Sequence, residues 1–140
     1  MGAWRYPRLI AHRCGGALAP ENTLAGLRIA ARLGVKAVEF DAMLSRDGVP
    51  VVIHDETLER TTNGTGRVAD TAAAELQALD AGAAHHPAYA GEPLPTLVAA
   101  LALCDELKLA VNLEIKPAAG YETVTGSTVA ALAAVCVPRA

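Results

Sequence analysis

The sequence predicts an α/β fold built on parallel strands. The order of elements supports this: apolar runs that suit strands alternate with segments that suit helices, in the order strand–helix, strand–insertion–helix, strand–helix. The predicted strands of the sheet cover residues 8–11, 37–44 and 110–115. Predicted helices follow them, beginning near residue 22, at residues 95–96 and near residue 121, and ending near residues 33, 107 and 135.

The first helix has clear signals at both ends. Asn22 or Thr23 is predicted to be its N-cap, because either side chain has an oxygen that can accept a hydrogen bond from the free N–H groups of the first turn. Gly34 is predicted to end it.

A turn signal follows the second strand. An Asp-Gly pair at residues 47–48 between apolar runs favours a two-residue hairpin loop, which would place Asp41 directly opposite His54. So short a connection forces antiparallel pairing. The returning strand, residues 49–53, is therefore predicted to belong to an insertion of about residues 45–94, with a short helix near its middle.

Composition excludes several functional classes. The chain has 140 residues, of which 30 are Ala, and aromatic residues make up only 4%, so a large core is not expected. The net charge of −3 and the lack of a basic run argue against nucleic acid as a partner. The longest uncharged stretch, 123–138, falls short of the roughly 20 apolar residues that a membrane span needs. Cys14, Cys104 and Cys136 form no CxxC motif or disulfide framework, which predicts a cytoplasmic protein.

Three carboxylates fall where strands of a parallel sheet carry functional groups. Glu39 and Asp41 are two residues apart on one predicted strand and so point to the same face. Glu114 occupies a similar place on the third strand. Carboxylates gathered in this way would repel one another without a cation, and hard oxygen ligands suit Mg²⁺ or Ca²⁺. The sequence therefore predicts a divalent-cation site.

Two histidines and two cations accompany these acids. His12 and His54 each end an apolar run, and imidazole suits proton transfer near neutral pH. Arg13 offers a bidentate fork for a phosphate, and Lys116 shares the face of Glu114. A divalent cation, two histidines and two cationic side chains together predict phosphoester chemistry.

These residues lie within longer motifs. The segments IAHRCGGALAPENTLAG, AVEFDAMLSRDGVPVVIHDETLERTTNGTG, LPTL and NLEIKP resemble the glycerophosphodiester phosphodiesterase family over residues 8–117. The resemblance implies a TIM (β/α)8 barrel with a small insertion after its second strand. It also implies metal-dependent hydrolysis of small-molecule glycerophosphodiesters to glycerol 3-phosphate and an alcohol. Whether water or the glycerol hydroxyl attacks first is left open.

The resemblance also assigns the site residues. His12 and His54 would be the acid–base pair, Arg13 would contact the phosphate, and Lys116 would lie near it. The cation, Mg²⁺ or Ca²⁺, would be held by Glu39, Asp41 and Glu114. One position departs from the family motif, which begins His-Arg-Gly: here the third residue is Cys14.

Length changes what the resemblance predicts. A TIM barrel needs about 250 residues and eight βα units, and this chain supplies about three plus the insertion. Residues 1–140 are therefore predicted to be one such domain, truncated at its C-terminus, with an unclosed barrel edge that favours self-association. Two alternatives remain open: a truncated, non-catalytic fragment, and a lysophospholipid phosphodiesterase resembling phospholipase D-like barrels.

Overall fold

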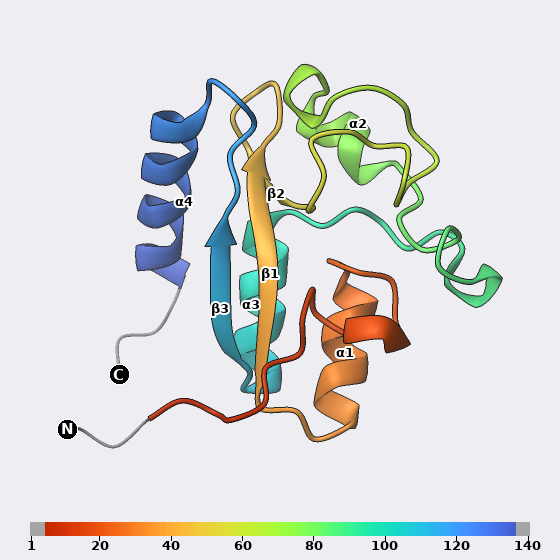
Figure 1. Cartoon of the computed structure of the whole chain (residues 1–140), viewed down its shortest axis with the longest axis vertical. Helices are drawn as coiled ribbons and strands as arrows, with labels where there is room; N and C mark the ends of the chain where they lie inside the picture. Colours follow the sequence, from red (N-terminus) through yellow and green to blue (C-terminus); the bar gives the residue numbers. More distant parts are fainter. Residues whose placement is uncertain (1–4, 137–140) are drawn as a thin grey trace.

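The computed structural model describes residues 5–136 and is built around one three-stranded sheet (Figure 1). Strand β1 (Ala37–Leu44) lies at its centre. It pairs in parallel with β3 (Ala110–Ile115) along one edge and antiparallel with β2 (Pro50–Val52) along the other. The parallel α/β arrangement and the antiparallel return predicted from the sequence are confirmed.

Three longer helices pack with this sheet: α1 (Leu24–Arg32), α3 (Leu97–Leu107) and α4 (Glu122–Cys136). The N-caps of the first two are threonines. Thr23 Oγ1 accepts from the Gly26 N–H at 3.1 Å, and Thr96 Oγ1 accepts from the Ala99 N–H at 3.2 Å. Of the two N-caps predicted for the first helix, Thr23 is therefore the one used.

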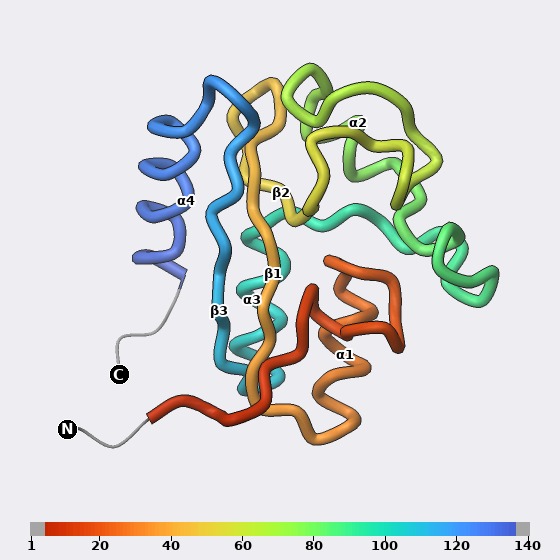
Figure 2. Tube along the Cα trace, in the orientation of Figure 1, coloured from red at the N-terminus to blue at the C-terminus, as the bar shows by residue number. Residues whose placement is uncertain are grey.

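The segment between β2 and α3 contains little regular structure. It holds one short helix, α2 (Ala73–Gln77), and two 3-10 turns (Val68–Asp70 and Pro87–Tyr89); a third such turn (Gly16–Leu18) precedes α1. Figure 2 traces this segment as it leaves the sheet near β2, lies to one side and returns to α3. No helix within residues 5–136 is long and apolar enough to cross a membrane.

The first predicted strand, residues 8–11, is only partly formed. Within the part of the chain that the structure describes, Ala11 alone of this run bridges to another strand, through hydrogen bonds to Ala37 and Glu39 of β1. Leu9 is 67% exposed. A strand needs a continuous row of partners, and β1 meets this run at one residue, so the prediction of a four-residue strand was wrong.

The predicted hairpin register was also wrong, by one residue. The observed pairs include Ala42 with Val52, and the N–H of Ile53 donates to the carbonyl of Asp41 at 3.1 Å. Asp41 is therefore opposite Ile53, not His54.

The cause lies in the turn, whose loop has three residues, 46–48, instead of two. Gly48 adopts a left-handed φ of 78°, which a three-residue hairpin loop requires. Ser45 closes the loop by donating its N–H to the carbonyl of Val49 at 3.0 Å and by accepting the N–H of Val49 on its Oγ at 3.0 Å.

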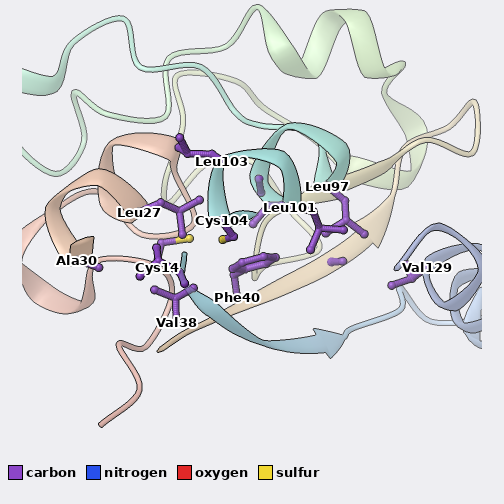
Figure 3. Close-up of a cluster of buried hydrophobic side chains, with 14 residues drawn as sticks. Cys14, Leu27, Ala30, Val38, Phe40, Leu97, Leu101, Leu103, Cys104 and Val129 are labelled. Carbon is purple, nitrogen blue, oxygen red and sulfur yellow. The ribbon is translucent and has the colours of Figure 1, made fainter. Parts of the chain in front are cut away.

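Alternate residues of β1 face different surroundings. Val38, Phe40 and Ala42 are buried in a cluster between the sheet and the helices, and Figure 3 shows Phe40 beside Leu101 and Cys104. A second buried cluster lies under the insertion and contains Met43, Val51, Ile53, Leu58, Val68, Leu76, Ala81 and Leu94. Because strand side chains alternate, Glu39 and Asp41 point away from the Phe40 cluster, and the core fixes the strand that presents them.

Candidate active site

Three carboxylates meet on the sheet face opposite Phe40. Glu39 and Asp41 come from β1, and Glu114 comes from β3, where its Cα is registered with that of Asp41. One ligand atom from each carboxylate lies within 4.8 Å of the others. The sequence placed these three residues in one site, and the structure brings them together.

Two of the carboxylates are held by neighbouring loops. Asp41 is 1% exposed, and its Oδ2 accepts a hydrogen bond from Nδ2 of Asn22 at 3.0 Å. Glu39 Oε2 accepts the backbone N–H of Arg13 at 2.9 Å, while Glu39 Oε1 is buried without a hydrogen-bond partner. A buried carboxylate oxygen without a partner, beside two further carboxylates, fits a hard divalent cation.

His12 lies at the exposed side of this cluster. Its Nε2 is 3.8 Å from Oε2 of Glu39, and its side chain is 72% exposed. The ring is therefore accessible to a molecule bound at the acidic cluster.

His54 reaches the same site by a different route from the one predicted. Its Nδ1 is 2.8 Å from Oδ1 of Asp55, and its Nε2 contacts Nζ of Lys116. Lys116 directly follows β3, and its N–H donates to the carbonyl of Ala42 at 2.9 Å. The wrong hairpin register therefore does not remove His54 from the site, because the chain turns out of β2 before this residue.

The guanidinium of Arg13 is held by a carboxylate. Its Nη1 donates to Oε1 of Glu21 at 3.1 Å, while its Nε is buried without a hydrogen-bond partner. Arg13 and Cys14 both have left-handed backbone conformations, with φ of 51° and 73°. Such a bend suits the Gly found in the family motif. The structure accommodates Cys14 by burying its side chain to 1% exposure in the core.

Four polar residues of the site received no site role from the sequence. They are Glu21, Asn22, Asp55 and Arg60. Partial burial alone would raise the pKa of the Glu21 carboxyl, but hydrogen bonds and charge from Arg60 and Arg13 lower it below its usual value. The hydrogen bonds from Arg60, and next from His54, hold the pKa of Asp55 well below its usual range. The only sign in the sequence that these four residues belong to the site is that they lie within the motifs shared with the family.

The fold and the site define an α/β protein with an acidic cluster on two neighbouring parallel strands, an arrangement that fits part of a TIM-type barrel. The chain belongs to the glycerophosphoryl diester phosphodiesterase family, which it matches over residues 12–139. It is 45% identical over 108 residues to a glycerophosphodiester phosphodiesterase of Caldanaerobacter subterraneus, covering 77% of this chain and 44% of the relative. It is 42% identical over 109 residues to glycerophosphodiester phosphodiesterase 1 of Homo sapiens, covering 76% of this chain and 33% of the relative.

Solved structures give the same result. An Oleispira antarctica phosphodiesterase in complex with the product sn-glycerol-3-phosphate matches with a TM-score of 0.92 and 43% identity, over 95% of this chain and 54% of that one. A glycerophosphodiester phosphodiesterase from Agrobacterium tumefaciens matches with a TM-score of 0.81 and 38% identity, over 91% and 52%. The chain therefore spans a third to about half the length of these relatives.

Proposed function

We propose that this chain carries the cation- and phosphate-binding part of an enzyme that hydrolyses glycerophosphodiesters to glycerol 3-phosphate and an alcohol. The observation that carries the proposal is the meeting of three carboxylates, with His12 beside one of them and with Lys116 in contact with His54 just after β3, in a chain of this family. Residues 1–140 would form part of one such domain, with residues 45–94 as its insertion.

The acidic cluster would hold the cation. Glu39, Asp41 and Glu114 supply hard oxygen ligands, and Mg²⁺ and Ca²⁺ both take such ligands. A bound cation would neutralise negative charge on the phosphoryl oxygens. Asn22 keeps Asp41 oriented by donating to its Oδ2, so the ligand geometry does not depend on the cation alone.

The histidines would move the protons. His12, on the exposed side of Glu39, is placed to exchange a proton with the attacking or leaving oxygen of a bound diester. His54 presents its Nε2 beside Lys116 and would serve the opposite oxygen. Arg13 and Lys116 would add positive charge around the phosphate.

A non-catalytic fragment is the second candidate. It is favoured by the length covered, 44% of one bacterial relative, and by the exposure of β3, whose Ile115 is 42% exposed. The outer edge of β3, which pairs with no other strand within residues 5–136, would then favour self-association. Free Cys14, Cys104 and Cys136 suit a reducing compartment and support a cytoplasmic location.

Hydrolysis of glycerophosphocholine decides between the two candidates. Release of glycerol 3-phosphate is measured with Mg²⁺ or Ca²⁺ for the wild type, His54→Gln and Glu39→Gln. Glu106→Gln is the matched control, because Glu106 is an exposed residue of α3 and its loss removes the same charge. The enzyme proposal expects turnover in the wild type and the control and a loss of at least about 100-fold in the two site variants. No turnover in a folded wild type would support the fragment.

A further inference from the structure

One arginine of the insertion joins two carboxylates of the site. Arg60 Nε and Nη2 donate to Oδ2 and Oδ1 of Asp55 at 2.7 and 2.9 Å. Its Nη1 and Nη2 donate to Oε2 and Oε1 of Glu21 at 2.9 and 2.8 Å. Both contacts are bidentate, the geometry in which a guanidinium binds a carboxylate most specifically.

Each of these carboxylates also contacts a proposed functional side chain. Glu21 Oε1 accepts from Arg13, and Asp55 Oδ1 pairs with Nδ1 of His54. The contacts therefore form a continuous path from the phosphate-binding arginine, through Arg60, to a proton-transferring histidine.

The path joins separate parts of the sequence. Glu21 precedes α1 and lies 39 residues before Arg60, whereas Asp55 lies five residues before it. The insertion is thus fastened to the loop that carries Arg13.

The path also determines which nitrogen of His54 carries the proton. Asp55 is ionised near neutral pH, and the fork of Arg60 holds both of its carboxylate oxygens so that Oδ1 meets Nδ1 of His54. An ionised carboxylate can only accept hydrogen bonds, so Nδ1 of His54 must donate. In the neutral ring, Nε2 then carries the lone pair and faces Lys116.

We propose that Arg60 is a positioning residue: by binding Glu21 and Asp55 together, it orients Arg13 and fixes His54 in the tautomer with its proton on Nδ1. Its effect on catalysis rests on the proposed function, whereas its effect on His54 does not. An exposed ion pair usually contributes little to stability. If the half-exposed Arg60 had only a structural role, replacing it would therefore leave the tautomer of His54 unchanged.

The direct test is ¹⁵N NMR of the imidazole nitrogens in the full chain. The variants are Arg60→Gln and Arg60→Lys, and Lys keeps the charge but cannot make either fork. Arg46→Gln is the matched control, since Arg46 is a 60% exposed arginine of the hairpin loop whose ion-pair partner, Glu75, lies 3.7 Å away. Loss of the corresponding signals in His54→Gln assigns the ring.

The expected wild-type spectrum shows His54 protonated on Nδ1. Arg60→Gln and Arg60→Lys shift the ring to a mixture of tautomers, while the Arg46 control keeps the wild-type spectrum. Preserved backbone amide spectra establish that each variant is folded. An unchanged His54 tautomer in both folded Arg60 variants would overturn the proposal. If Arg60→Gln fails to fold, the Arg60→Lys variant alone decides by the same criterion.

Turnover provides a separate readout. In an active wild type, Arg60→Gln lowers kcat/KM by about 10- to 100-fold, as expected when an orienting partner behind a functional histidine is lost. Turnover unchanged from wild type in a folded variant would contradict the catalytic consequence. If the wild type itself shows no turnover, the proposed function fails, and the tautomer measurement still decides the role of Arg60.

Discussion

Removing one carboxylate from the acidic cluster tests the electrostatics of the site. Two unit charges 4.8 Å apart interact by about 3.5 kcal/mol at an effective dielectric constant near 20, and by about 0.9 kcal/mol in water. Glu39→Gln removes such a repulsion while keeping an oxygen that can accept the N–H of Arg13. We expect the free energy of unfolding without a cation to rise by about 1–3 kcal/mol.

A cation should reverse this order. At a concentration 100 times its dissociation constant it stabilises the wild type by about 2.7 kcal/mol, which is roughly 8–13 °C in Tm for a chain of this length. Glu39→Gln should gain much less, and Glu106→Gln should gain as much as the wild type. The assay is thermal unfolding with a chelator, then with Mg²⁺ or Ca²⁺, at constant ionic strength. A cation-free Glu39→Gln that melts below the wild type, or gains as much from the cation, would refute this reasoning.

Three further predictions concern the core, the thiols and acid stability. Phe40→Ala should lower the free energy of unfolding, measured in urea, by about 3–5 kcal/mol, because a fully buried ring is lost from the largest core cluster. A loss of less than about 1 kcal/mol would contradict the burial of Phe40 in that cluster. In the native protein at pH 8, Cys14 should resist a disulfide reagent because burial raises the pKa of its thiol, whereas the partly exposed Cys136 should react. Mass analysis of peptides shows which cysteine carries the label. A labelled Cys14 in the native protein would contradict this prediction. Hydrogen bonds from Arg60 lower the pKa of Glu21 and Asp55 in the native protein. The contribution of these two carboxylates to stability is therefore complete above about pH 5 and is lost as the pH falls through their native pKa values. A free energy of unfolding that does not change between pH 5 and pH 3 would contradict this prediction.

Helices and strands could be predicted from the sequence where the residues that determine them lie within the element or at its ends. The strand at residues 37–44 follows from its own apolar run, and α1 follows from the oxygen of Thr23 at one end and Gly34 at the other. The hairpin register was not predictable in this way. It depends on whether the turn contains two residues or three, and the side-chain oxygen of Ser45, which accepts the N–H of Val49, decides for three.

In the proposed site, too, some residues could be predicted from the sequence and others could not. Side chains on neighbouring parallel strands, such as Asp41 and Glu114, could be placed together because parallel register brings the carboxyl ends of strands to one edge. Asn22 and Arg60 could not, because their partners lie 19 and 39 residues away and reach them through loops without a periodic pattern. Asn22 looked like a helix cap, yet it supports the buried Asp41.

Our central proposal is that the acidic cluster of this chain, with a bound divalent cation, supports the hydrolysis of glycerophosphodiesters. A ³¹P NMR time course of glycerophosphocholine with the 140-residue chain tests it most directly. We predict that the diester resonance is converted to the monoester resonance of glycerol 3-phosphate with Mg²⁺ or Ca²⁺. Chelation should stop the conversion, and Glu39→Gln should abolish it. A diester resonance that stays unchanged with folded wild-type protein and either cation, or conversion that continues in chelator, would contradict the claim.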